Sequence, residues 1–238
     1  MNRYNLTARV FPMLLFYLPL LILAVIFSIE IDKKIHVLSS CGVIAALSYF
    51  NAQLGRKYGK RKELALWQSW DGAPTTQVLR WRSTVLDDNT KKRYHFKLQS
   101  LCPVNPFPTE AVEAADQLKA DAAYNSWITY LISQTRDTKK FSLLFSENIN
   151  YGFWRNLWAL KNAALLLDTF VMVGLYLYFY FLQHTSNPLS FPAIFFISEA
   201  LLLVILFLWA FVITSDSIKI PAFGYAERLV ESINEIKN

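Results

Sequence analysis

The chain has 238 residues, enough for one or two domains, and a formal net charge of +6 at pH 7. Apolar residues make up 54% of the sequence and gather into four long runs, while the charges lie almost entirely outside them. The 2 cysteines are too few for a structural zinc site, and Cys41 and Cys102 fall in different segments, which argues against a disulfide.

Each of the four apolar runs is long enough to cross a membrane as a helix. A helix rises about 1.5 Å per residue, so roughly 20 residues span a hydrocarbon core of about 30 Å. The runs lack the polar stripe that an amphipathic soluble helix shows. The first run is longer than a signal-peptide core and no A-x-A site follows it, so we expect it to be retained. The sequence thus predicts two transmembrane hairpins, with helices at 10–28, 35–52, 163–182 and 191–214.

The positive charges near these runs predict how the chain is oriented. Eleven lysines and arginines flank the runs on the side of the two termini and the central segment, against only Lys33 and Lys34 on the other side. Because cytoplasmic loops carry the excess of basic residues, we expect both termini and the central segment to be cytoplasmic.

The segment between the hairpins, 53–162, is predicted to form a basic helical cytosolic domain. Each residue of 87–90 is a candidate helix cap, Thr109 can cap another helix, and the three prolines in 102–108 predict a loop. A short amphipathic helix is expected after Pro221, and Gly152 is a possible interruption. We therefore predict an all-α protein with parts 1–52, 53–162, 163–214 and 215–238, and central helices at about 53–70, 74–83, 88–101, 110–134 and 141–162.

The central domain concentrates positive charge. It holds 17 lysines and arginines against 10 acidic residues, with five basic residues in the seven positions 56–62. This block suits either anchoring to anionic lipid or binding an anionic ligand. The residues predicted to bind such a ligand are Arg56, Lys57, Lys60, Arg61, Lys62, Arg80, Arg82, Lys91, Lys92, Arg93, Lys139, Lys140 and Arg155.

Six of the seven tryptophans lie in the same domain. Cations together with aromatic rings are typical of sites for single-stranded nucleic acid or nucleotides, because phosphates take the charge and bases stack on rings. The alternative is that these rings pack a small core or lie at the lipid interface.

A few polar residues fall inside the apolar runs. Ionisable groups in a membrane usually face a bundle interior or water, so Asp168 and Glu199 are candidate pore residues. Asp168 lies near the end of its run and has the alternative of reaching the interface. In the second run His36, Ser40 and Asn51 share a stripe that would resemble a gate around a symmetry axis. Gly42 and Ala46 on the neighbouring face equally suit tight packing within one bundle.

The sequence contains no catalytic motif that we can identify. The stretch GRKYGKR at 55–61 lacks the spacing and the Ser or Thr of a phosphate-binding loop, and His95 and His184 have no partners at metal-ligand spacing. We therefore expect a protein that is not an enzyme and that has no cofactor.

Two stretches resemble a bacterial family of four-helix inner-membrane proteins that has no assigned activity. They are GK…E…LW…W…G…PTT…LR at 59–80 and DTK…F…F…ENINYGF…RNLW at 137–158. More broadly, the plan is similar to that of the membrane effectors of nucleotide-signalled anti-phage systems, the Hailong type above all. This resemblance implies an oligomeric channel controlled by a nucleic-acid-like ligand, with a cytosolic nucleotidyltransferase as a partner.

Two functions are therefore expected from different classes. The first is a homo-oligomeric channel or pore-forming effector in the inner membrane, gated by a nucleotide or oligonucleotide at its cytosolic domain. The second is a membrane-anchored adaptor or sensor that docks a protein partner without forming a pore.

Overall fold

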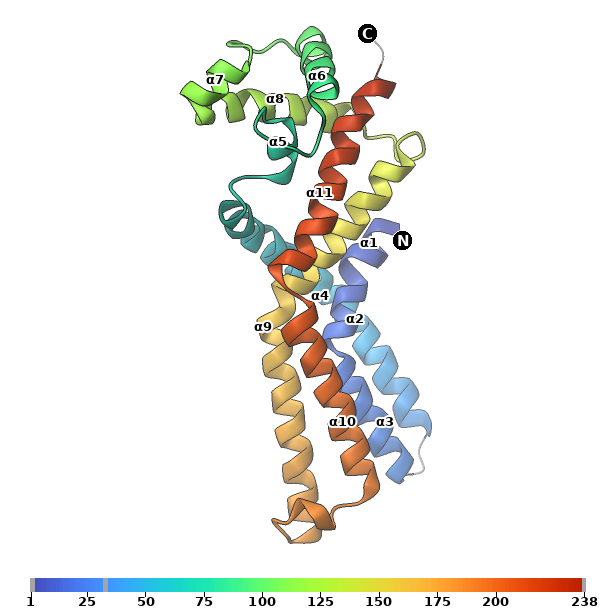
Figure 1. The fold of residues 1–238 in the computed structure, drawn as a ribbon. Helices are drawn as coiled ribbons and strands as arrows, with labels where there is room; N and C mark the ends of the chain where they lie inside the picture. The colour runs from blue at the N-terminus through green and yellow to red at the C-terminus, as the bar shows by residue number, and fades with distance from the viewer. Residues whose placement is uncertain (1–2, 32–33, 237–238) are drawn as a thin grey trace. The chain divides into compact units, whose positions relative to one another are not determined.

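The computed structural model describes the backbone of residues 3–31 and 34–236 and the side chains of 3–25, 42–49, 51 and 57–236. Every regular element in this part is a helix, which confirms the all-α prediction for it (Figure 1). The chain divides into two compact units. The apolar unit comprises Met1–Lys62 and Gly152–Ile218, and the polar unit comprises Glu63–Tyr151 and Lys219–Asn238.

The long apolar helices belong to the apolar unit. Among the described residues, two helical segments are long and apolar enough to cross a membrane, Ser142–Gln183 and Ala193–Val212. The elements that contribute to this unit are α1 (Arg3–Asn5), η1 (Leu6–Val10), α2 (Phe11–Phe16), α3 (Leu18–Ile31), α4 (Lys34–Ser69), α9 (Ser142–Gln183), η2 (Pro188–Ser190), α10 (Ala193–Phe207) and η3 (Leu208–Val212).

The first apolar run is a bent pair of helices. The axis turns by 53° between Arg3–Phe16 and Leu18–Val25. Pro19 lies just after the break at Tyr17 and has no N–H to bond the carbonyl four residues earlier, so an unbroken helix is disfavoured here. If this pair is one span, the described residues contain three candidate spans. The run at 35–52 is helical within α4, but half of its side chains lie outside the described residues, so a fourth span stays a prediction.

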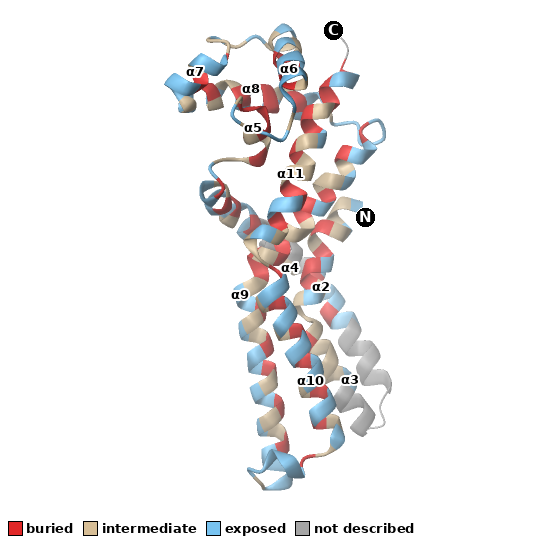
Figure 2. Ribbon diagram, in the orientation of Figure 1, coloured by how far each residue is buried: buried red, intermediate tan, exposed pale blue. Residues whose placement is uncertain are grey.

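Helices α9 and α10 pack side by side and divide into an inner and an outer face (Figures 1 and 2). Val171, Leu175 and Phe179 of α9 pack with Phe195 and Leu202 of α10 in a buried cluster. The outer faces are apolar but exposed, as lipid-facing surfaces are. They include Leu166, Phe170, Val173, Phe181, Ile197, Leu201, Val204, Phe207 and Phe211.

A glycine and an asparagine bring α4, α9 and the N-terminal segment together within the apolar unit. Asn156 of α9 is buried and its amide nitrogen donates to the Ala8 carbonyl at 2.6 Å. A Cβ on Gly59 of α4 would overlap the Asn156 amide oxygen, so α4 reaches this side chain because position 59 lacks one. Gly152 allows a similar approach, since a Cβ there would lie only 3.0 Å from the Tyr4 hydroxyl.

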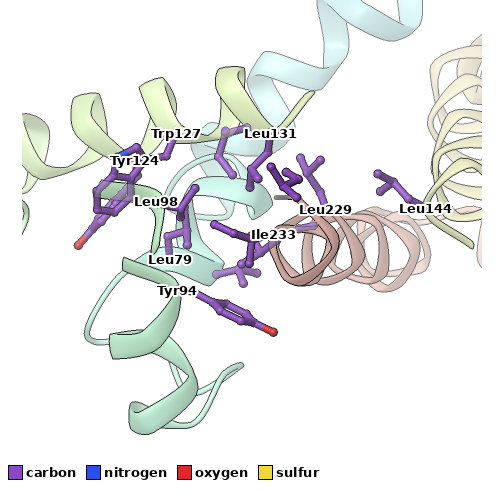
Figure 3. Close-up of a cluster of buried hydrophobic side chains, with 14 of the residues drawn as sticks. Leu79, Tyr94, Leu98, Tyr124, Trp127, Leu131, Leu144, Leu229 and Ile233 are labelled. Atoms are coloured by element: carbon purple, nitrogen blue, oxygen red, sulfur yellow. The ribbon is translucent and has the colours of Figure 1, made fainter. Parts of the chain in front are cut away.

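The polar unit is built on a core of aromatic and aliphatic side chains from five α-helices and the short 3-10 helix that follows the last of them (Figure 3). Tyr94, Leu98, Tyr124, Trp127 and Leu229 are at most 4% exposed. The further elements of this unit are α5 (Pro74–Leu79), α6 (Asp88–Leu101), α7 (Glu110–Ala115), α8 (Gln117–Gln134), α11 (Ser215–Glu231), which begins in the apolar unit, and η4 (Ser232–Glu235).

The predicted caps are confirmed, but several helix boundaries were wrong. The Asp87 and Thr109 side chains accept from the N–H groups of residues 90 and 112. The single helix expected over 110–134 is two, because Asp116 is extended and caps α8 through the Lys119 N–H. Helix α5 ends at Leu79 instead of 83, α9 continues through position 152, and α11 begins at Ser215, before Pro221.

The approach of α4 to α9 predicts that Gly59→Ala destabilises the apolar unit. The added methyl overlaps the Asn156 side chain, and overpacking of this kind costs about 1–3 kcal/mol. Gly42→Ala is the matched control: Gly42 lies on the same helix, and a Cβ at that position would meet nothing within 4 Å. That control should be neutral or stabilising by up to about 1 kcal/mol through helix propensity. Thermal unfolding of the full chain in detergent measures both, and equal effects would contradict the packing described.

Candidate functional site

Two of the thirteen basic residues predicted to bind a ligand are buried inside the polar unit. Arg80 is 3% exposed, and its guanidinium donates to both carboxylate oxygens of Asp121 at 2.9 and 2.7 Å. It also donates to the backbone and side-chain oxygens of Asp71 at 2.7 and 2.9 Å. Burial acts to lower the pKa of Arg80, but these bonds and charges outweigh it and the pKa is raised, so the group stays a cation. Its donors are therefore engaged within the fold.

Lys91 and Glu113 hold the irregular segment that follows α5. The Lys91 ammonium is 1% exposed and donates to the carbonyls of Trp81 and Ser83 at 2.8 and 2.7 Å. The Glu113 carboxylate accepts from the N–H groups of Trp81 and Arg82 at 2.8 and 3.3 Å. Side chains thus satisfy the backbone groups that a helix would otherwise pair.

The remaining predicted cations differ in how available they are. Arg155 is buried, the Lys62 ammonium donates to the Ala159 carbonyl at 3.1 Å, Arg82 pairs with Asp71, and the Arg56 side chain lies outside the described residues. Lys140 is exposed and donates to the Glu235 carbonyl at 3.2 Å. Among these predicted residues, the other exposed cations that make no ion pair with a described carboxylate are Lys57, Lys60 and Arg61 in the apolar unit and Lys92, Arg93 and Lys139 in the polar unit.

The tryptophans of the polar unit are packing residues. Trp127 is fully buried and its ring N–H donates to the Cys102 carbonyl at 2.9 Å, while that of Trp81 donates to the Pro108 carbonyl at 2.7 Å. None of the six tryptophans in 53–162 is exposed, so in this fold they follow the packing alternative. The exposed ring is instead that of Phe96, which stacks on Phe107.

His95 lies at the centre of these rings and is fully buried. Its Nε2 lies 2.8 Å from the Leu79 carbonyl and donates to it, while Nδ1 has no partner. Trp81, Tyr124 and Trp127 surround the imidazole at centroid distances of 4.6 to 5.5 Å. Burial lowers the pKa of His95 to about 4, so the ring is neutral at pH 7.

A surface cavity of about 340 Å³ lies at the start of α9, against α6 and the end of α11. Its charged groups are Lys140, Arg228, Glu231 and Glu235, and the Arg228 guanidinium pairs with Glu231 at 2.6 Å. Opposite charges balance, so this cavity suits a small polar ligand better than a polyanion. Sequence reasoning missed Arg228 as a lining residue, although its place on the amphipathic helix after Pro221 was a usable signal.

The predicted pore residues fall into three groups. The side chains of His36 and Ser40 lie outside the described residues. Asn51 is partly buried and its amide donates to the Tyr17 hydroxyl at 2.6 Å, a contact that the sequence did not indicate. Asp168 and Glu199 belong to the apolar unit, where Asp168 is 0% exposed.

The buried oxygens of these two acids have no hydrogen-bond partner among the described residues. Both carboxylate oxygens of Asp168 and Oε1 of Glu199 are buried without a hydrogen bond, and so is the hydroxyl of Ser48 on α4. The two carboxylates are close enough for their charges to interact. Within the described residues, no three His, Cys, Asp or Glu side chains gather as a metal site would require.

Comparison with protein-family models, with curated proteins and with solved structures finds no match to this chain.

The Arg80 network predicts that Arg80→Gln strongly destabilises the polar unit. Removing one partner of a buried pair leaves a carboxylate unpaired and costs about 3 kcal/mol or more. Arg82→Gln, which removes an exposed cation from the same Asp71, should cost at most about 1 kcal/mol. Denaturant unfolding of the full chain followed by tryptophan fluorescence compares the two variants. Similar losses in the free energy of unfolding would show that the buried pair of Arg80 with Asp121 does not stabilise the unit more than the exposed pair does.

The buried imidazole predicts a pH dependence of stability. The unfolded chain binds a proton at His95 near pH 6.5, whereas the folded chain does so only near pH 4. The free energy of unfolding should therefore be highest above pH 6.5 and fall toward pH 4, by at most about 3 kcal/mol from this residue. Unfolding measured across this range should lose that part of its slope in His95→Phe and keep it in His184→Gln, because His184 is exposed. Equal slopes in the wild type and in His95→Phe would refute the assignment.

Proposed function

We propose that this chain is the subunit of a homo-oligomeric channel in a bacterial inner membrane, and that an anionic nucleotide or oligonucleotide gates it from the cytosol. In this proposal four helices span the membrane, both termini are cytoplasmic, and the protein acts in anti-phage defence beside a nucleotidyltransferase, as the resemblance described above implies. The observation that carries the proposal is Asp168, which is fully buried and has no hydrogen-bond partner in the part of the chain that the structure describes, in a unit whose outer helix faces are apolar. A helix that serves only as an anchor has no use for such a residue.

Exposed cations support the gating half of the proposal. Lys57, Lys60 and Arg61 lie within one helical turn or so of each other on α4, and Lys92 and Arg93 are adjacent on α6. Since none pairs with a described carboxylate, their charge is available to phosphate groups. The structure favours these exposed residues over Arg80 and Lys91 as ligand contacts.

The adaptor alternative has an observation of its own. The polar unit exposes several large apolar side chains, among them Leu118 at 83%, Leu143 at 69% and Phe96 at 67%. Exposed apolar residues of this size are common at sites where proteins dock. An adaptor would bind its partner through them and would conduct nothing.

Flux through reconstituted liposomes tests the proposal. We expect ion flux that changes when a short single-stranded oligothymidylate is added to the side bearing the polar unit. We expect the binding of that probe to weaken steeply with salt, because bound phosphates release counterions. In Lys57→Gln/Lys60→Gln/Arg61→Gln, the slope of log affinity against log salt should fall by about 2 if all three cations contact phosphates.

The control and the contrary outcomes separate the alternatives. Lys119→Gln/Arg136→Gln/Lys219→Gln removes three other positive charges of the polar unit and should leave the slope nearly unchanged. Unchanged probe binding in the Lys57 triple variant, with weaker binding to anionic vesicles, would assign this block to lipid. Absence of flux at every probe and salt concentration would favour the adaptor.

A further inference from the structure

Asp168 lies where the packing of the apolar unit should place an apolar side chain. The buried residues of α9 recur at helical spacing as Ala164, Asp168, Val171 and Leu175. Ala164 belongs to one buried hydrophobic cluster and Val171 to the next, so the carboxylate lies between the two on the inner face of the helix. Apolar side chains therefore line α9 above and below it.

Glu199 is the acid that faces the same region from α10. It is half-buried and precedes Leu202, which packs in the cluster of Val171. Its buried Oε1 has no hydrogen-bond partner, and its charge interacts with that of Asp168. Two helices thus each present an unsatisfied carboxyl group.

No described cation neutralises this pair. Lys161, two turns before Asp168 on α9, donates instead to the carbonyls of Ala210 and Ile213 at 2.7 and 2.9 Å. The described side chains of α3 (18–25) and of α4 within the unit's apolar stretch (42–49) include no charged residue. The hydroxyl of Ser198 donates to the Ile194 carbonyl at 2.5 Å, so it does not serve the carboxyl groups either.

The surroundings decide what can neutralise the two acids. An ionised carboxylate is very costly in an apolar interior without a partner, and two close together repel each other. Ca²⁺ and Mg²⁺ need six or more oxygen ligands, and two carboxylates supply four while the backbone carbonyls of α9 and α10 are engaged in their helices. A proton needs only one oxygen and no hydration shell.

We propose that Asp168 and Glu199 form a proton-binding site inside the apolar unit. A hydronium ion gives its proton to a carboxylate oxygen, an O–H bond forms, one water molecule leaves and the charge is neutralised. In the packing described here burial without a described partner favours the protonated form of both carboxyl groups. When the contact between α9 and α10 opens to water, they ionise and release their protons.

This site would give the channel a charge that appears only on opening. The closed unit presents no fixed charge at this depth, and the hydrated unit presents two negative charges per chain. Repeated around an oligomer axis, rings of acids favour cations. This last consequence rests on the proposed channel function, whereas the proton site does not.

Infrared spectroscopy of the full chain in lipid tests the site without requiring flux. At pH 7 the wild type should show the C=O stretching band of protonated carboxyl groups, shifted in D2O. Asp168→Asn and Glu199→Gln keep size and should each remove about half of that band if the pair holds two protons. Asp216→Asn, which changes an exposed acid of the same unit, should leave the band intact.

Three results would overturn the proposal. The first is the absence of the band in the wild type at pH 7, a measurement that does not depend on the folding of any variant. The second is a band that survives in both Asp168→Asn and Glu199→Gln. The third is a band that appears only when sodium and potassium are replaced by choline, which would identify a metal-cation site. If the band is present but no flux is found, the proton-binding site is supported and the channel function is refuted. If flux is found but the band is absent, the channel function is supported and the proton-binding site is refuted.

Discussion

The cost of burying charge organises both units of this protein, and the two units meet it in opposite ways. In the polar unit each buried charge has fixed partners: Arg80 binds Asp71 and Asp121, and Lys91 and Glu113 bind backbone groups of the segment after α5. In the apolar unit the fully buried Asp168 has none among the described residues. A buried charge with fixed partners holds its helices together, whereas a buried charge without a partner must be neutralised by a species that binds from solution.

The matched charges explain how the polar unit holds together around a segment without regular structure. Lys91 from α6 binds the carbonyls of Trp81 and Ser83, and Glu113 from α7 accepts from the N–H groups of Trp81 and Arg82, so the two side chains satisfy this backbone from two sides. Glu113 also accepts from the Tyr124 hydroxyl of α8 at 2.7 Å. Three helices are thereby tied to one turn, and the same turn closes over the ring of His95. The core of aromatic residues is in this way continuous with the polar network.

The features that the sequence could predict are those that depend on interactions between residues close together along the chain. Helices and their caps depend on neighbours three or four residues apart, so the caps at Asp87 and Thr109 could be read directly. The role of Arg80 could not, because Asp121 lies 41 residues further along the chain and a count of charges does not show burial. The break at Asp116 was missed because a long helix and two shorter ones share the same composition. For Asp168 the signal was present, since Ala164, Val171 and Leu175 place it on the inner stripe.

The position of Asp168 also bears on which kind of function the apolar unit performs. A leucine at this site would join the two buried clusters that the carboxyl group separates, and replacing a buried polar group by a well-packed apolar one is often neutral or stabilising. The acid therefore contributes nothing to packing that an apolar residue would not contribute better. A membrane anchor for an adaptor would need only the apolar outer faces of α9 and α10. An acid that is neutral when packed and charged when hydrated would suit a unit whose interior meets water in part of its cycle, which is what the proposed channel requires of it.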